Sequence, residues 1–166
     1  MKLDRQWVSI DDLIADLRQV ACSLLAHRDR RLLAPSSPAG ADLLTDPPAV
    51  RGILSALLVD AARFSSLGDV ALRITRDAYA VRFSIETESE RDAAGTSVAE
   101  TAAGTYLALC QAERLARLLG GEVVTFEADG KRKLSLVLPR VDAVGQPLLR
   151  AMRQIRTTQP AAILAA

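Results

Sequence analysis

Residues 46–66 decide the fold, and they read DPPAVRGILSALLVDAARFSS. Asp46 is a residue type that favours the N-cap of a helix, and Pro47 and Pro48 suit the first turn. The apolar residues that follow recur at steps of three and four: Val50, Ile53, Leu54, Leu57, Leu58, Ala61 and Phe64. This spacing predicts a helix with one buried face, which ends at residues 65–68.

The residues around this helix predict a second helix and a hairpin. Ser9 is expected to cap a helix whose apolar residues repeat through residues 10–25. Residues 69–76 and 79–86 alternate apolar and polar side chains, with only Asp77-Ala78 between them. Alternation across so short a connection predicts an antiparallel hairpin. A short strand is also expected within residues 30–34.

The second half of the chain predicts a long loop, a helix and another hairpin. Residues 88–103 are small and polar without a period, which is typical of a loop that is functional or mobile. A helix is expected from about Thr105 until Gly120-Gly121, a pair that favours helix termination. Residues 122–138 predict a hairpin around Asp129-Gly130, and residues 142–156 predict a short final helix.

The order of these elements does not alternate strand and helix, so a parallel doubly wound sheet is excluded. We expect an α+β fold: a two-layer α/β sandwich with a mixed, mostly antiparallel sheet that about three helices cover on one face. The expected organisation is a leader at residues 1–8, one domain at residues 9–140, and a C-terminal helix and tail at residues 141–166.

Composition and charge exclude several classes of protein. The chain has 166 residues, of which 49% are hydrophobic and 25% charged, and these values are typical of a globular domain. Because 21 Lys and Arg oppose 20 Asp and Glu, we expect no nucleic-acid partner. No apolar run is long enough to span a bilayer, and we expect a cytoplasmic protein without a membrane partner. Cys22 and Cys110 are expected to be reduced core residues.

Three segments resemble the ATP-binding domain of sensor histidine kinases, the Bergerat-fold (GHKL) ATPases. Residues 46–66 resemble the asparagine-box helix of that family. Residues 81–89, VRFSIETES, resemble the strand that ends in its first glycine box. Residues 104–139 resemble its second glycine box, the following helix and the closing hairpin. The resemblance implies the Bergerat fold over most of the chain.

The resemblance also implies which residues would hold Mg-ATP, and three of them, Asp60, Thr87 and Tyr106, depart from the family pattern. Asp60 stands where the family has an Asn that holds magnesium, so Asp60 is the candidate metal ligand. Arg63 matches a basic residue of the family. An alternative reading pairs Asp60 with Arg63 as an i,i+3 ion pair on a solvated edge of the helix.

The two glycine boxes are altered as well. Thr87 aligns with the Asp that accepts a hydrogen bond from the adenine amino group, and Glu86 or Glu88 could replace it only if the strand register slipped by one residue. Gly104 is retained, but Tyr106 replaces the next glycine, either plugging the pocket or lying half-buried. His27 reads as a surface residue rather than a phosphoacceptor.

Three functions follow from this pattern. The first is a degenerate, non-catalytic kinase-like domain that binds proteins in bacterial two-component or sigma-factor signalling, with a response regulator or a histidine kinase as partner and no cofactor. The second is an ATPase domain of protein kinase type that binds Mg-ATP through Asp60, Arg63, Thr87, Gly104 and Tyr106. The third is a structural module that forms a homodimer through its C-terminal helix, although the apolar residues of that helix could instead pack on the domain itself.

Overall fold

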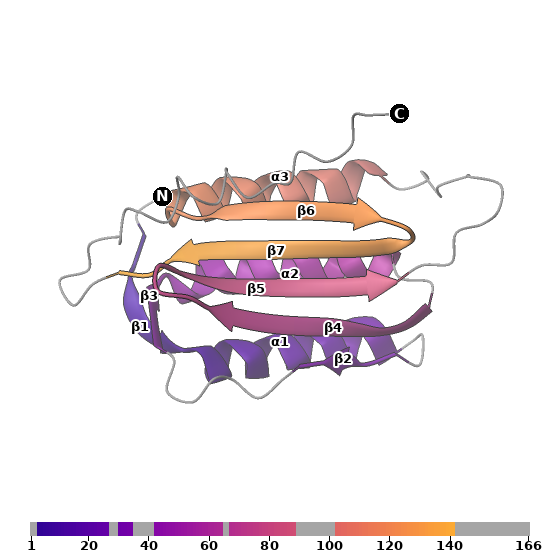
Figure 1. Cartoon of the computed structure of the whole chain (residues 1–166), viewed down its shortest axis with the longest axis horizontal. Coiled ribbons are helices and arrows are strands. Elements are labelled where there is room, and N and C mark those ends of the chain that lie inside the picture. Colours follow the sequence, from indigo (N-terminus) through magenta and orange to yellow (C-terminus); the bar gives the residue numbers. More distant parts are fainter. Residues whose placement is uncertain (1–2, 27–29, 35–41, 65–66, 89–101, 142–166) are drawn as a thin grey trace.

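The computed structural model describes residues 3–26, 30–34, 42–64, 67–88 and 102–141. Along the chain it has the elements β1 (Gln6–Ser9), α1 (Ile10–Leu25), β2 (Leu32–Leu33), β3 (Asp42–Thr45), α2 (Pro47–Phe64), β4 (Leu67–Arg76), β5 (Ala80–Glu88), α3 (Ala102–Leu118), β6 (Glu122–Ala128) and β7 (Lys131–Pro139). The ribbon in Figure 1 shows how they are arranged.

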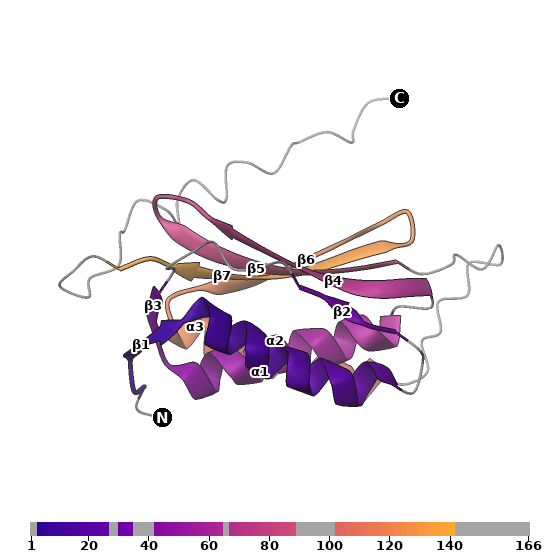
Figure 2. The same ribbon diagram turned by 90° about the horizontal axis from the view of Figure 1, so that it is seen from below.

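Five strands form one twisted sheet in the order β2-β4-β5-β7-β6. The short β2 runs parallel to β4, and every other pair in this sheet is antiparallel. All three helices lie on the same face of the sheet, as the edge-on view shows (Figure 2). The structure therefore confirms the expected two-layer α+β sandwich with a mixed, mostly antiparallel sheet.

The hydrophobic core fills the space between this sheet and the helices. From the middle of α2, Ile53 and Leu57 are fully buried, and they belong to the same cluster as Phe83 of β5 and Leu136 of β7. Burying one such side chain contributes roughly 1.5–3 kcal/mol. The spacing of apolar residues in residues 46–66 thus predicts the face of α2 that packs on the sheet.

Asp46 caps α2 as expected and also ties down the N-terminal segment. Its Oδ1 accepts a hydrogen bond from the Ala49 backbone N–H at 3.0 Å, and its Oδ2 accepts one from the Asp4 N–H at 2.9 Å. The expected leader at residues 1–8 was wrong in part, because residues 6–9 form β1 and pair with β3 in a separate two-stranded sheet. The strand β3 was not predicted from the sequence either.

Several other expectations are refined or lie outside the described residues. The α3 helix begins at Ala102, earlier than the expected start near Thr105. Both cysteines are free, but Cys22 is exposed and Cys110 is half-buried, so neither is a core residue as expected. His27, residues 89–101 and residues 142–166 lie outside the described part of the chain. None of the described helices is long and apolar enough to cross a membrane.

Gly120 and Gly121 end α3 for two different reasons. Gly120 has a φ of 81°, a left-handed conformation that side chains rarely adopt, and its N–H donates to the Arg117 carbonyl at 3.0 Å. Gly121 has no positive φ, but a Cβ there would lie 2.2 Å from the Val137 carbonyl oxygen. The second glycine therefore lets the chain pass closely beside β7 as β6 begins.

We predict that Gly121→Ala lowers the free energy of unfolding by about 1–3 kcal/mol, because the added methyl group must displace the β7 backbone. Urea denaturation measures this change. Gly52→Ala is the matched control: Gly52 lies on the exposed face of α2 with nothing within 4 Å of its added Cβ, so this change should stabilise by up to about 1 kcal/mol. Equal effects of the two substitutions would contradict the packing described here.

Candidate functional site

Asp60 lies on the last turns of α2 and faces the sheet. The apolar stripe of α2 points into the core, and Asp60 sits at its border, one residue before Ala61. Its side chain is only 5% exposed. One reading of the sequence offered an ion pair between Asp60 and Arg63 on a solvated edge of the helix. The solvated position was wrong for Asp60, which is a buried carboxylate at the interface between α2 and the sheet.

Arg132, near the start of β7, is the partner of this carboxylate. Its Nη2 lies 2.8 Å from Asp60 Oδ2, and its side chain is 19% exposed. The guanidinium carbon lies 5.1 Å from the centroid of the Phe64 ring, a cation–π distance. Toward the neighbouring strand β6, Arg132 Nη1 lies 3.5 Å from Glu127 Oε2. Arg132 thus joins the sheet to the end of α2 through charge and through packing.

Thr87 lies directly beside Arg132 in the sheet. The two residues are opposite each other in the β5–β7 register. Thr87 is 3% exposed, and its Oγ1 is buried without a hydrogen-bond partner among the described residues. The alternation of β5 places Thr87 on the helix-facing side with Phe83 and Ile85, so Glu86 and Glu88 point the other way. The register slip that would bring a glutamate into this site does not occur.

The pKa of Asp60 is raised above its ordinary value of 3.8. Burial is the largest cause, since it disfavours the charged carboxylate. The positive charges of Arg132 and Arg63 lower the pKa, and the negative charge of Glu127 raises it further. Arg63 itself is exposed, so its role at this site is a modest electrostatic one.

The predicted nucleotide residues are brought together only in part. Asp60, Arg63 and Thr87 gather at the end of α2 and beside Arg132. Gly104 and Tyr106 lie within the first turns of α3, which begins two residues before Gly104. The side chains of residues 102–106 lie outside the described part of the chain, so the two expectations for Tyr106 remain predictions.

Sequence reasoning missed Arg132, although a signal was present. In the stretch Arg132 to Leu138, the residues Leu134, Leu136 and Leu138 alternate on the core-facing side of β7. Arg132 has the same parity, so its side chain must start on the core side of the sheet. A charged residue at such a position needs a buried partner, and Asp60 is a residue that can supply it.

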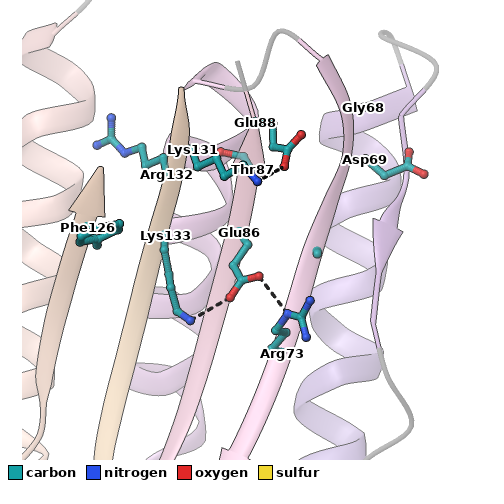
Figure 3. A pocket seen from close by; sticks show the side chains of 11 residues that line it. Gly68, Asp69, Arg73, Glu86, Thr87, Glu88, Phe126, Lys131, Arg132 and Lys133 are labelled. Atoms are coloured by element: carbon teal, nitrogen blue, oxygen red, sulfur yellow. Dashed lines mark hydrogen bonds and ion pairs between the residues drawn. The ribbon is translucent and has the colours of Figure 1, made fainter. Parts of the chain in front are cut away.

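A hollow of about 490 Å³ lies on the other face of the sheet, and its lining includes Thr87 and Arg132 of the site at the end of α2 (Figure 3). At its centre, Glu86 accepts a hydrogen bond from Arg73 Nε at 2.9 Å, and its other oxygen lies 2.8 Å from Lys133 Nζ. Burial alone would raise the pKa of Glu86, but the contacts with Lys133 and Arg73 outweigh it and lower the pKa. Phe126 of β6 forms an exposed wall of this hollow.

Comparison with solved structures identifies the class of fold. ShkA, determined at full length in complex with AMPPNP, superposes with a TM-score of 0.73 and 20% sequence identity over 86% of this chain and 32% of that chain. The Acinetobacter baumannii histidine kinase AdeS superposes with a TM-score of 0.67 and 16% identity, over 86% of this chain and 70% of that one. The chain has the fold of a histidine kinase-like ATPase domain.

The chain spans about a third of the length of the ShkA chain. No protein-family model matches the sequence, and no curated protein matches it. The similarity is therefore one of fold, and the residues at the end of α2 decide what can be inferred about chemistry.

We predict that Arg132→Ala lowers the free energy of unfolding by about 3 kcal/mol at pH 7, because it leaves the buried Asp60 carboxylate without its partner. The loss should shrink as the pH falls toward 3.8, the ordinary pKa of this group. The pKa of Asp60 is higher in the folded protein than in the unfolded chain. The contribution of this group to the free energy of unfolding is therefore fully present below the unfolded pKa and is lost as the pH rises through the folded pKa. Urea denaturation between pH 4 and pH 7 measures both effects.

The double variant Asp60→Leu/Arg132→Met is the control for this prediction. It removes both charges while keeping the apolar volume, and it should recover most of the stability lost by Arg132→Ala. An Arg132→Ala variant as stable as the parent at pH 7 would contradict the ion pair.

Proposed function

We propose that this chain is a degenerate histidine kinase-like domain that does not bind ATP and acts by binding a protein in bacterial two-component or sigma-factor signalling. The observation that carries the proposal is the position of Arg132. Its guanidinium lies against Asp60 and in register with Thr87, the two positions that would face magnesium and adenine in the family that the sequence resembles. A side chain that fills this space competes directly with a nucleotide.

The donor set at this position also fits a magnesium ion poorly. Magnesium prefers several oxygen ligands in an octahedral arrangement. The Oδ2 of Asp60 already faces a cation at 2.8 Å, and the described residues contain no group of three or more His, Cys, Asp or Glu that could hold a metal. A magnesium ion would have to displace Arg132 to reach Asp60.

Protein binding is the function that this combination favours. The apolar interface that builds the fold is retained, while the polar residues that would orient ATP are replaced. Large apolar side chains remain exposed on two separate parts of the surface: Trp7 of β1 is 58% exposed and Phe126 of β6 is 60% exposed. Exposed aromatic residues are enriched at protein interfaces. The proposed partner is a response regulator or a histidine kinase, and such a pairing would take place in the cytoplasm.

Mg-ATP binding is the second candidate, and one observation favours it. Thr87 Oγ1 is buried without a hydrogen-bond partner among the described residues, which is unusual unless a ligand or water completes it. ShkA, which shares the fold, was determined in complex with AMPPNP. In this alternative, Arg132 would turn toward Glu127 and leave Asp60, Thr87 and Arg63 to the nucleotide.

We predict no change in the thermal unfolding midpoint with 5 mM Mg-ATP, because Arg132 occupies the region that the base and the ion would need. A ligand present at 100 times its Kd adds about 2.7 kcal/mol to the free energy of unfolding, so even a weak binder would shift the midpoint measurably. Magnesium with tripolyphosphate is the control for nonspecific anion effects. A shift with Mg-ATP alone would overturn the proposal in favour of the second candidate.

We further predict saturable binding of the chain to a receiver domain from a panel of purified response regulators, measured by interferometry with and without the phosphate mimic beryllofluoride. Trp7→Ala and Phe126→Ala serve to locate the contact, since each removes an exposed aromatic residue from a different part of the surface. The affinity should be the same with and without Mg-ATP. Absence of saturable binding across the panel would argue against a receiver domain as partner.

A further inference from the structure

The two edges of the five-stranded sheet differ in how much backbone they offer to another strand. β2 forms one edge and has only two residues. β6 forms the other edge with seven residues, Glu122–Ala128, and no described strand lies on its outer side, as Figure 1 shows. Edge strands are commonly protected against pairing by shortness, bulges, lysine or proline. The sequence of β6, EVVTFEA, contains neither lysine nor proline, and its register with β7 is continuous.

The turn at Asp129-Gly130 fixes which backbone groups of β6 point outward. Both turn residues have positive φ, 53° and 73°, as in a type I′ turn. Ala128 and Lys131 flank this two-residue turn, so the Ala128 carbonyl faces the Lys131 N–H and the two residues form a hydrogen-bonded pair. Because hydrogen-bonded and non-hydrogen-bonded pairs alternate along an antiparallel ladder, every second residue of β6 bonds to β7. The remaining residues direct their N–H and C=O groups to the outer side: Val123, Thr125 and Glu127.

Two apolar side chains lie beside these outward-pointing groups. Val124 and Phe126 stand opposite Ser135 and Lys133 on the side of the sheet away from the helices, where Figure 3 shows Phe126. They are 40% and 60% exposed. An edge that combines outward-pointing backbone groups with exposed apolar side chains is a site at which another strand can add to the sheet.

We propose that β6 pairs with β6 of a second copy of this chain, antiparallel and across a two-fold axis at Thr125. Thr125 is the midpoint of Glu122–Ala128, so this axis lets all seven residues of each strand overlap. Because the backbone groups of Thr125 point outward, the two copies of Thr125 form a hydrogen-bonded pair at the centre. Val123 of each copy then bonds to Glu127 of the other, which gives about six backbone hydrogen bonds in all. The two sheets become one continuous sheet around an isologous interface.

The exposed apolar side chains match in this register. Val124 of one copy stands opposite Phe126 of the other in a non-hydrogen-bonded pair, the kind in which the side chains are closest. A pair of an aromatic and a β-branched side chain stabilises a sheet more than a pair of alanines does. Because of the symmetry the contact occurs twice, and it covers the two large apolar side chains that β6 exposes.

The charges are also compatible with a second copy. Like charges directly opposite each other destabilise a sheet. In the proposed register Glu127 stands opposite Val123 and Glu122 stands opposite Ala128, so no glutamate of β6 faces another. Lys131, which is opposite Ala128 on β7 and 70% exposed, places a positive charge beyond this small side chain and toward Glu122 of the second copy. The agreement of backbone, apolar contacts and charge favours a second copy over an unrelated strand.

The helix layer offers a further contact between the two copies. The α3 helix runs along the same edge as β6 (Figure 1). Joining two β6 strands brings the two copies of α3 next to each other. Leu107 and Leu118 lie about three turns apart on one face of α3. They are 60% and 45% exposed and are available to extend the interface.

Sedimentation velocity of the full chain tests the pairing. We expect a reversible dimer at about 100 μM protein that dissociates on dilution. Phe126→Lys places a charge against Val124 of the second copy and should raise the dissociation constant at least tenfold. Leu33→Lys is the matched control: Leu33 of β2 is 54% exposed at the opposite edge of the sheet, and its change should leave the dissociation constant unaltered. Circular dichroism checks the fold of each variant.

Disulfide cross-linking tests the register. In a background with Cys22→Ser and Cys110→Ser, Thr125→Cys places a thiol on the axis. The Cα atoms of a hydrogen-bonded pair are about 5.5 Å apart, a separation that a disulfide can span. Glu127→Cys is the matched control, since it lies on the same strand and face but its two copies would be more than about 13 Å apart. On oxidation with copper phenanthroline, Thr125→Cys should form linked dimers at least tenfold faster than Glu127→Cys.

Three results would overturn the proposal. The first is a chain that remains monomeric at about 100 μM. The second is a dimer that Phe126→Lys leaves unchanged, which would place the contact elsewhere on the chain. The third is equal cross-linking of the two cysteine variants. None of these results depends on whether the chain binds a nucleotide or a receiver domain, so the inference can fail or hold independently of the proposed function.

Discussion

The ion pair between Asp60 and Arg132 is the constraint on which the interpretation of this protein depends. It joins the end of α2 to the start of β7 across the layer boundary, where the two side chains are 5% and 19% exposed. A pair so deeply placed is weak evidence for stability, because desolvation offsets most of the attraction. Its clearer consequence is spatial: the guanidinium of Arg132 lies 5.1 Å from the centroid of the Phe64 ring, and Arg132 stands opposite Thr87 in the β5–β7 register.

The fold and the candidate site place different demands on the sequence. The α2 helix contributes to both, because its apolar stripe packs against Phe83 and Leu136 while its border carries Asp60. Packing demands only apolar side chains of suitable volume, whereas holding a nucleotide demands particular donors and acceptors. Similar folds at 20% and 16% identity are the expected result when the first requirement is met. Whether the chain also has the donors and acceptors that hold a nucleotide has to be judged from the residues at the end of α2.

Much of the fold could be predicted from the sequence because it arises locally. The cap at Asp46, the alternation in β5 and the turn at Asp129-Gly130, where both residues have positive φ, depend on near neighbours in the chain. The pairing of β1 with β3 could not be predicted from the sequence, because two four-residue strands separated by a helix carry little sequence signal of their own. Asp60 and Arg132 are 72 positions apart, and only the register of β7 and the rotation of α2 bring them together. The expectations for Gly104 and Tyr106 at the second glycine box stay predictions, because the side chains of residues 102–106 lie outside the described part of the chain.

A crystal structure of the chain grown with excess Mg-AMPPNP tests the central claim most directly. Our account predicts that Arg132 Nη2 remains within hydrogen-bond distance of Asp60, with no nucleotide density between α2 and β5. A nucleotide seated over Thr87, with Arg132 turned away from Asp60 and magnesium in its place, would contradict the account.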